Sequence, residues 1–255
     1  MTTALVTGGA VRVGRAFVEA LAADGYAVAI HCHGSTEAGE NLAARLRADG
    51  AEVAVVRADL ADDNAVRTLV GEAAARLGPV TTLVNSASIF EPDTSADLDP
   101  ASFRRQLGIN LLAPLLLTRE LRAQLPSDSV GNVVNVLDQK VEAPLPDYLS
   151  YTLSKTGLAT ATRLLAIEQA PRMRVNAIAP GLTLPSGAQS QAAFEAVHAQ
   201  TPLERGNTTA DLVHALRYLL AAPAVTGQIL YVDGGQRLEP RYTDPTITGH
   251  VRSPA

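Results

Sequence analysis

The chain has 255 residues, of which 47% are hydrophobic and 18% charged, and its formal net charge at pH 7 is −5. This length and composition suit a sizeable folded core, in one large α/β domain or two small ones, and exclude a globally disordered chain. The acidic balance argues against a general affinity for nucleic acid or for an anionic membrane.

The chain contains one cysteine, Cys32, so no disulfide can form within it, and a reducing compartment fits this composition. Its longest apolar runs are shorter than a membrane span, and its first residues carry neither a basic segment nor a cleavage-like site. We therefore expect a cytoplasmic protein without an export signal.

Short apolar runs alternate with helical patterns along the whole chain. The predicted strands are Thr3–Thr7, Tyr26–Ile30, Glu52–Val56, Val80–Val84, Asn132–Leu137, Met173–Ile178 and Gln228–Val232. The predicted helices are Val13–Ala23, Thr36–Asp49, Asp62–Leu77, a long helix over about Ala101–Gln124, one around Tyr151–Gln169 and one near Asp211–Ala221. Short strands buried on both faces and separated by helices predict a doubly wound parallel α/β sheet of seven strands.

The chain shows no linker or repeat that would divide it, so we expect a single domain over residues 1–238. A segment rich in Ser, Gly, Pro and Gln begins at Pro180, and we place a substrate loop at about 182–205. This loop could close over a substrate as a lid, or it could be an ordinary surface loop. The tail 239–255 has no clear period and could be loose or could fold over the site.

A glycine-rich turn, Thr7 to Gly14, joins the first strand to the first helix. Glycines at such a turn let backbone N–H groups approach a pyrophosphate at the helix N-terminus. The spacing differs from G-x-G-x-x-G, but the position of the turn predicts a dinucleotide site. The residues of this turn that we expect to contact the cofactor are Gly8, Arg12, Val13 and Gly14.

The end of the second strand distinguishes NAD from NADP. An acidic residue there would bind a ribose 2′-hydroxyl, but the chain carries His31, His33 and Ser35 at this place, and its next acid is Glu37. Arg12 and His31 could instead meet a 2′-phosphate, and the hydroxyl of Ser35 could add a contact. We therefore predict NADP(H); the alternative is that the histidines are ordinary surface residues.

Polar and small residues also follow the third and fourth strands. Asp59, with Leu60 beside it, could lie over the edge of an adenine, or Asp59 or Asp62 could cap the next helix. The segment Asn85-Ser86-Ala87 follows the fourth strand, next to the point where ligands enter such sheets. Small side chains there would let a flat cofactor lie against the backbone.

Asn110 is a polar residue inside an apolar helical run. A buried amide needs hydrogen-bond partners, so Asn110 is either structural or part of a water relay, and the structural reading is favoured for a lone asparagine. We still count Asn110 with Asp138, Tyr151 and Lys155 among the candidate catalytic residues.

Tyr151 and Lys155 are four residues apart on a predicted helix, which places them on one helix face. A cation beside a phenol favours the phenolate, so we expect Lys155 to lower the pKa of Tyr151 and to make it a proton donor near neutral pH. Asp138 ends the preceding strand and is expected to lie nearby. The alternatives are an idle surface pair and a loop carboxylate that faces water.

Taken in order, these residues resemble the short-chain dehydrogenase/reductase family. The resemblance covers residues 3 to about 236 and is carried by Thr7-Gly8…Gly14, Asp59, Asn85-Ser86-Ala87, Asn110, Tyr151-x-x-x-Lys155, Asn176, Pro180-Gly181 and Val232-Asp233-Gly234-Gly235. It implies a Rossmann-type sheet, a nicotinamide cofactor contacted also by Pro180 and Gly181, and a homotetramer.

Two departures from the common family pattern resemble its pteridine reductase branch: Asp138 replaces the usual serine and Arg12 replaces the middle glycine of the phosphate loop. In that branch the aromatic residue matching Phe90 stacks a pterin against the nicotinamide, and the serine matching Ser88 contacts the pterin. The arginine that often precedes the serine at position 35 is Gly34 here.

The resemblance implies that NADPH delivers a hydride, that Tyr151 donates the proton, and that Lys155 also holds the nicotinamide ribose. A carboxylate such as Asp138 repels a developing oxyanion but suits a heterocycle with N–H groups. We therefore predict reduction of a pterin-like C=N substrate of the dihydropteridine or dihydrofolate type. The alternatives are a general carbonyl or 3-oxoacyl reductase and a dinucleotide-binding sensor without catalysis.

Overall fold

The computed structural model describes residues 2–185 and 190–239 of the chain. In this part of the chain a seven-stranded parallel sheet has the order β3-β2-β1-β4-β5-β6-β7. Its strands are β1 Thr3–Thr7, β2 Ala27–Cys32, β3 Val53–Arg57, β4 Val80–Asn85, β5 Gly131–Val136, β6 Met173–Pro180 and β7 Ile229–Val232. The predicted fold class, a doubly wound Rossmann-type sheet, is confirmed.

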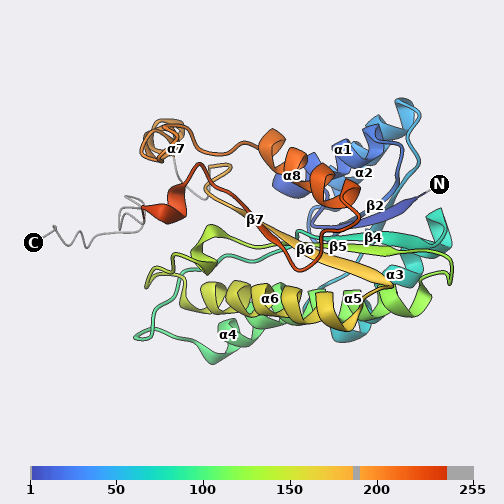
Figure 1. The fold of residues 1–255 in the computed structure, drawn as a ribbon, viewed down its shortest axis with the longest axis horizontal. Helices are drawn as coiled ribbons and strands as arrows, with labels where there is room; N and C mark the ends of the chain where they lie inside the picture. The colour runs from blue at the N-terminus through green and yellow to red at the C-terminus, as the bar shows by residue number, and fades with distance from the viewer. Residues whose placement is uncertain (1, 186–189, 240–255) are drawn as a thin grey trace, which may run out of the picture.

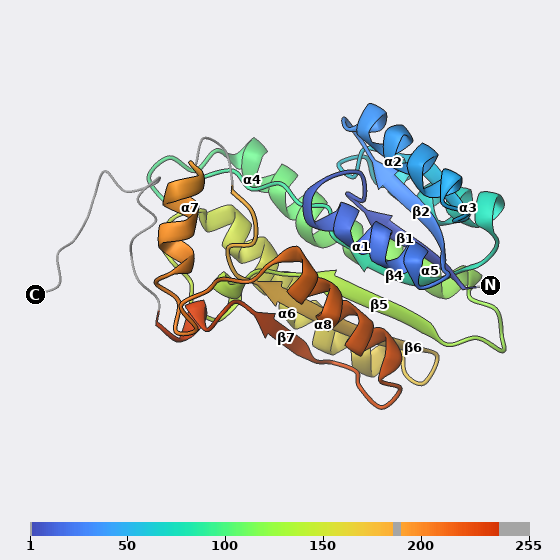
Figure 2. The same cartoon turned by 90° about the horizontal axis from the view of Figure 1, so that it is seen from above.

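Helices cover both faces of the sheet (Figures 1 and 2). The helices are α1 Arg12–Ala23, α2 Thr36–Ala48, α3 Asp63–Leu77, α4 Pro100–Leu107, α5 Ala113–Gln124, α6 Leu149–Glu168, α7 Gln191–His198 and α8 Thr209–Ala221, with short turns η1 Gly108–Leu112, η2 Gln139–Val141 and η3 Gln236–Leu238. Figure 1 shows α1, α2 and α8 above the sheet and α3, α5 and α6 below it. In the described residues, no helix has the length and apolar character needed to cross a membrane.

The apolar runs of the sequence become strands because both faces of the sheet are buried. All residues of β1 and β2 are buried, as expected for central parallel strands. One core cluster on the α1, α2 and α8 face includes Phe17 and Leu216, and another on the α3, α5 and α6 face includes Leu83 and Leu117. Because helices cover both faces of the sheet, a ligand can bind only at an edge or an end of it. The loops at the carboxyl ends of the strands are the usual place in such folds.

The strand order reverses at β1, which pairs with β2 on one side and β4 on the other. At this switch point Thr7 and Asn85 are paired across β1 and β4, and Asn85 is paired with Asn135 across β4 and β5. The hydroxyl oxygen of Thr7 accepts the backbone N–H groups of Ser86 and Ala87, both at 3.0 Å. The first and fourth strand ends are therefore fixed together where a cofactor enters such a sheet.

Two segments differ from the prediction. The long helix expected over about 101–124 is divided into α4 and α5 by a π-helical turn, Gly108–Leu112. The segment expected to be loop contains a further helix, α7, whose N-cap residue Ser190 accepts the backbone N–H of Ala193 at 3.2 Å. The predicted domain limits stay a prediction, and all of the tail except Glu239 lies outside the described residues.

Candidate active site

A cleft of about 690 Å³ lies at the carboxyl ends of the central strands. Most of the residues predicted to form the site line it, namely Gly8, Arg12, Val13, Gly14, His31, His33, Ser35, Asp59, Leu60, Ser86, Ala87, Ser88, Phe90, Asp138, Tyr151, Lys155, Pro180 and Gly181. The two remaining predicted residues, Asn85 and Asn110, lie behind its wall as buried side chains. Direct contact with a ligand stays a prediction for each of these residues.

The phosphate loop has the shape of a cradle. Gly8 has a φ of +64°, and a Cβ on it would be 2.9 Å from the Cα of Ala87. A Cβ on Gly14 would overlap the carbonyl oxygen of Gly8. Helix α1 has no side-chain cap and no acidic residue in its first turn, so its N–H groups remain open to an anion. This geometry fits the pyrophosphate of a dinucleotide.

Arg12 occupies the left-handed region with a φ of 52°, at the position where the resemblance expects a glycine. Its guanidinium donates to the carbonyl oxygen of Pro185 at 3.0 Å, in the loop after β6. β6 and β2 lie on opposite sides of β1 in the sheet. The expectation that Arg12 meets a 2′-phosphate at the end of β2 therefore does not fit this geometry, because the side chain points the other way.

His31 is a buried, neutral side chain, and the expectation that it meets a 2′-phosphate is also corrected. The backbone N–H of Gly8 donates to His31 Nδ1 at 3.2 Å, and His31 Nε2 lies 3.2 Å from the carbonyl oxygen of Ala58. Burial, as the largest cause, lowers the pKa of His31 to about 4. With both ring nitrogens engaged, His31 supports the phosphate loop from behind.

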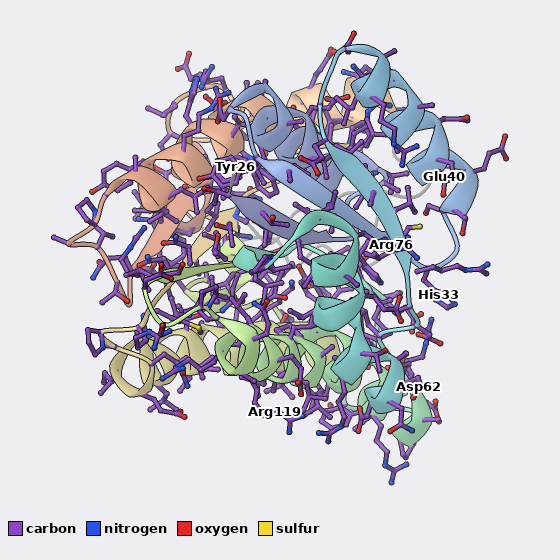
Figure 3. The ribbon with its side chains drawn as sticks, turned by 90° about the vertical axis from the view of Figure 1, so that its right-hand side faces the viewer. Tyr26, His33, Glu40, Asp62, Arg76 and Arg119 are labelled. Carbon is purple, nitrogen blue, oxygen red and sulfur yellow. The ribbon has the colours of Figure 1, made fainter. Side chains whose placement is uncertain are left out.

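At this end of the cleft His33 is exposed, whereas Ser35 and Asp59 are half-buried. His33 lies at the edge of the molecule (Figure 3), and its Nδ1 is 3.7 Å from a carboxylate oxygen of Asp59. Asp62, not Asp59, caps α3, because its carboxylate accepts the N–H of Asn64 at 2.9 Å. Ser35 stands at the N-cap position of α2 but makes no side-chain cap hydrogen bond.

Asp138 and Tyr151 converge in the cleft. The Tyr151 hydroxyl donates to Asp138 Oδ2 at 2.9 Å, and the Lys140 backbone N–H donates to Asp138 Oδ1 at 2.9 Å. Lys155 Nζ donates to the carbonyl oxygen of Val136 at 2.7 Å and lies 5.7 Å from the centroid of the Tyr151 ring. The phenol is thus bonded to the carboxylate, with the ammonium beside its ring.

The expected lowering of the Tyr151 pKa is wrong for this arrangement. Burial and then the neighbouring Asp138 carboxylate raise the pKa of Tyr151 well above its ordinary value. Burial also raises the pKa of Asp138, against the opposing hydrogen bond and charge of Lys140. Burial lowers the pKa of Lys155 to about 8, although Asp138 opposes that shift. Burial therefore makes both the phenol and the carboxyl group weaker acids than they are in water.

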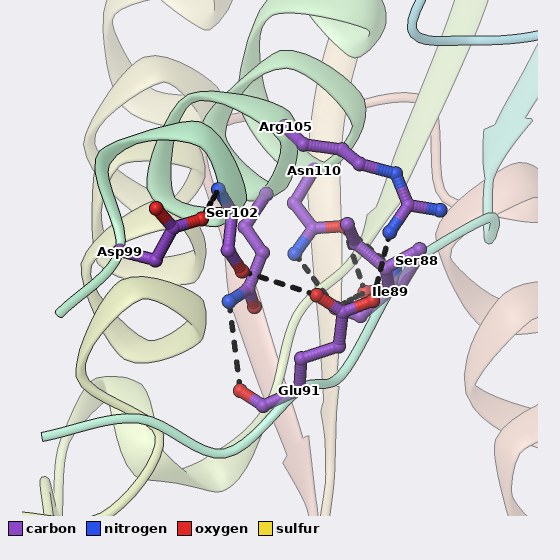
Figure 4. A network of polar contacts seen from close by, with 8 residues as sticks. Ser88, Ile89, Glu91, Asp99, Ser102, Arg105 and Asn110 are labelled. Atoms are coloured by element: carbon purple, nitrogen blue, oxygen red, sulfur yellow. Dashed lines mark hydrogen bonds and ion pairs between the residues drawn. The ribbon is translucent and has the colours of Figure 1, made fainter. Parts of the chain in front are cut away.

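Both polar atoms of the Asn110 side chain have protein partners, and its predicted catalytic role stays a prediction. It lies in the π-helical turn, and its Nδ2 donates to the Ile89 carbonyl oxygen at 3.0 Å and to Ser154 Oγ at 3.1 Å. Its Oδ1 accepts the Ile89 N–H at 2.9 Å and the Ser88 hydroxyl at 3.1 Å (Figure 4). The amide therefore joins the segment after β4 to α6.

Hydrogen bonds fix the residues before and after Phe90, Ile89 and Glu91, and the exposed ring of Phe90 lines the cleft. The carboxylate of its neighbour Glu91 accepts a hydrogen bond from the Arg105 guanidinium at 2.8 Å and one from the Ser102 hydroxyl at 3.1 Å (Figure 4). The Phe90 ring stacks on Tyr148 with centroids 3.9 Å apart and meets Tyr151 edge-on at 4.6 Å. A flat aromatic platform thus lies directly beside the phenol.

Asn85 supports the wall of the cleft rather than lining it. Its Nδ2 donates to Asn135 Oδ1 at 2.8 Å, and Asn135 Nδ2 donates to the Thr162 hydroxyl oxygen at 3.0 Å. This buried chain of polar groups joins β4 to β5 and β5 to α6. The sequence prediction placed Asn85 correctly at the strand end but could not show which way its side chain points.

The first residues of the predicted substrate loop are anchored. The Leu182 N–H donates to Gln236 Oε1 at 3.1 Å, and Asn207 Nδ2 donates to the Thr183 hydroxyl oxygen at 2.6 Å. Residues 186–189 of the predicted lid lie outside the described residues. Lys140 also lines the cleft, and the sequence analysis missed it although it is one of only two lysines in the chain.

Known proteins resemble this chain over nearly its whole length. A family model described as enoyl-(acyl carrier protein) reductase matches residues 9–237. The granaticin polyketide synthase putative ketoacyl reductase 2 of Streptomyces violaceoruber is 36% identical over 242 residues, which cover 92% of this chain and 96% of that protein.

Two solved structures are more similar in sequence. Alternative dihydrofolate reductase 1 (FolM) of Brucella canis, complexed with NADP, is 44% identical with a TM-score of 0.90 and covers 97% of this chain and 98% of that one. The FolM structure from Brucella suis, also with NADP, is 44% identical with a TM-score of 0.88 and covers 93% of this chain and 96% of that one. The chain therefore belongs to the short-chain dehydrogenase/reductase family.

Proposed function

We propose that this short-chain oxidoreductase uses NADPH to reduce a pterin-like C=N substrate of the dihydropteridine or dihydrofolate type. The observation that carries the proposal is the hydrogen bond between Tyr151 and Asp138 at 2.9 Å, beside the exposed ring of Phe90. The names of the FolM structures, dihydrofolate reductases solved with NADP, support the same substrate class and the same cofactor.

The residues of the cleft fit NADPH, which when bound supplies a hydride. The cradle around Gly8 and Gly14 would hold the pyrophosphate at the open N-terminus of α1. His33 and Ser35 would meet the 2′-phosphate at the end of β2. Lys155, whose ammonium lies beside Tyr151, would hold the nicotinamide ribose.

The proton would come from the pair formed by Tyr151 and Asp138. Burial, and then the charge of the neighbouring Asp138 carboxylate, disfavour a phenolate, so the pKa of Tyr151 is raised. Tyr151 would give its proton to the substrate nitrogen, and the Asp138 carboxylate, which accepts the hydrogen bond of the phenol, would orient the hydroxyl for that transfer. The ammonium of Lys155, beside the Tyr151 ring, would offset the negative charge that this transfer leaves on the phenol oxygen.

A ketoacyl reductase is the second candidate, because the Streptomyces relative carries that name. Reduction of a ketone places negative charge on oxygen, and an ionised carboxylate at Asp138 would oppose it. A pterin instead offers N–H groups and a nitrogen that takes up a proton, and a flat ring that can stack on Phe90. A sensor without catalysis would need only the phosphate loop, so the Tyr151, Asp138 and Lys155 arrangement argues against it.

A kinetic comparison of dihydrobiopterin and dihydrofolate with a keto-ester, each with NADPH, tests the proposal. We expect a higher kcat/KM for the pterins, and Asp138→Ser should shift the preference towards the ketone. Tyr151→Phe should lower kcat by at least about 100-fold while NADPH affinity changes by less than about twofold. A wild-type preference for the keto-ester would favour the ketoacyl candidate, and NADPH binding without turnover of any of these substrates would favour a sensor.

We also propose that the protein is a cytoplasmic homotetramer, as the family resemblance implies. Its one cysteine, Cys32, is a buried free thiol, which suits a reducing compartment. Leu153, Leu164 and Ile167 are exposed apolar residues on the outer face of α6, with 49%, 61% and 79% of their surfaces accessible. Such a stripe is typical of a surface that binds another chain.

A further inference from the structure

Helix α6, which carries Tyr151 and Lys155, begins without a cap of its own. Its N-cap residue is Tyr148, which has the left-handed φ and ψ of 56° and 48° and makes no side-chain cap hydrogen bond. The first N–H groups of a helix have no partner within it and must find one elsewhere. In the catalytic helix this partner comes from a distant part of the chain.

Asp93, in the segment between β4 and α4, supplies the cap. Its carbonyl oxygen accepts the Leu149 N–H at 3.0 Å, and its Oδ1 accepts the Ser150 N–H at 3.0 Å. Its Oδ2 accepts the Ser150 hydroxyl. Asp93 is 7% exposed and Ser150 is fully buried, so this contact is shielded from water. A carboxylate at a helix N-terminus is also favoured by the helix dipole.

The cap lies directly beside the proton donor, because Ser150 precedes Tyr151. One turn further along α6, Ser154 accepts a hydrogen bond from Asn110 Nδ2 at 3.1 Å. Residues 150 and 154 lie on one face of the helix, and both are held by elements that follow β4. The catalytic turn of α6 is therefore fixed at two points on either side of Tyr151.

The same segment carries the aromatic platform, since Phe90 precedes Asp93 by three residues. Phe90 meets the Tyr151 ring edge-on with centroids 4.6 Å apart. A segment that is bound to α6 through Asp93 thus holds the platform and the phenol at a fixed mutual distance.

We propose that Asp93 is a positioning residue, which caps α6 so that the Tyr151 hydroxyl stays in register with Asp138 and with the ring of Phe90. This inference rests on the proposed role of Tyr151 as proton donor. Displacement of a reacting group by about 1 Å can cost about 100-fold in rate, so the cap should affect turnover more than cofactor binding.

The test compares Asp93→Ala and Asp93→Asn, with Asp62→Ala as the matched control. Asp62 is a carboxylate that caps α3 by accepting the Asn64 N–H at 2.9 Å, and α3 carries none of the proposed catalytic side chains. We expect Asp93→Ala to lower kcat for dihydrobiopterin about 10- to 100-fold, with the Kd for NADPH changed by less than about twofold. Asp93→Asn keeps an oxygen that can accept the Ser150 N–H and should recover most of kcat. Asp62→Ala should lower Tm and leave kcat unchanged.

An unchanged kcat in Asp93→Ala, or an equal loss of kcat in Asp62→Ala, would overturn the proposal. If Asp93→Ala does not fold, Ser150→Ala removes only the hydroxyl contact and should lower kcat to a smaller extent; an unchanged kcat there would count against the proposal. If the wild-type protein turns over no pterin or ketone, the ¹³C NMR shift of the Tyr151 phenol decides instead. That shift should change in Asp93→Ala and not in Asp62→Ala, and an unchanged shift would reject the positioning role whatever the substrate.

Discussion

His31 and Lys155 are two cationic residue types whose charge is set by burial. His31 is 2% exposed, and its pKa of about 4 keeps the ring neutral at physiological pH. Lys155 is also 2% exposed, yet its pKa of about 8 leaves the ammonium charged there. Equal burial therefore leaves His31 neutral, as a support of the phosphate loop, and Lys155 charged, beside Tyr151.

We predict that His31 makes stability fall at acid pH. Its folded pKa of about 4 lies below the ordinary value of 6.5, so the unfolded chain binds a proton that the folded chain resists. The contribution of neutral His31 to the free energy of unfolding is complete above about pH 6.5. It should decrease by about 2 kcal/mol between pH 7 and pH 5. Urea unfolding at both pH values measures this change. His31→Ala should be less stable at pH 7 and should lose this component of the pH dependence.

The control for His31 is His214, an exposed histidine on α8. His214→Ala should leave the free energy of unfolding at pH 7 nearly unchanged, because its side chain is exposed. An equal pH dependence in wild type and His31→Ala would contradict the assignment.

At the scale of elements, the backbone of the phosphate loop was predicted from the sequence, but the direction of one of its side chains was not. The glycines, the following helix and the preceding strand were all predicted from local pattern. The direction of Arg12 was not, because it depends on the loop after β6, which lies 173 residues away from Arg12 in the chain.

Two further features were not predicted from the sequence: the π turn at Gly108–Leu112 and the cap of α6 by Asp93. An apolar helical period over 101–124 is compatible with one inserted residue, so the interruption leaves no clear local signal. Asp93 acts on a helix that begins 56 residues later, and only the folded chain brings the two together. The short helix α7 was missed although Ser190, a favoured N-cap residue, precedes it.

We predict that Gly14→Ala damages the cofactor site without unfolding the protein. The added Cβ would overlap the Gly8 carbonyl oxygen, so the loop that frames the pyrophosphate must shift. The Kd for NADPH, measured by the fluorescence of the bound cofactor, should rise by at least about 10-fold, since a misaligned cradle loses charge-assisted hydrogen bonds.

Gly71→Ala provides the control for this change. Gly71 lies within α3, where an added Cβ would meet nothing within 4 Å. This substitution should leave NADPH affinity unchanged and stabilise the helix by about 0.5–1 kcal/mol. Equal affinity of wild type and Gly14→Ala for NADPH would show that the loop tolerates the added carbon.

At the scale of the whole molecule, the alternation of strands and helices was enough to predict the parallel sheet and the edge that carries the site. The same pattern predicted that Asp138 and Tyr151 lie close together, and both line one cleft. It could not show that the two groups bond directly, nor that their burial raises both pKa values, because burial depends on all the elements that pack around α6. The sign of the Tyr151 shift was wrong for that reason.

The last prediction concerns assembly. We expect light scattering coupled to gel filtration to give about four times the 26.7 kDa mass of one chain, as for a homotetramer. Replacing Leu164 and Ile167 together by Glu would place two charges on the exposed apolar stripe of α6 and should reduce the mass of the assembly. Ala75→Glu on the exposed face of α3 is the control and should leave the mass unchanged. A single-chain mass for the wild type would reject the tetramer, and an unchanged mass for the double variant would move the contact away from α6.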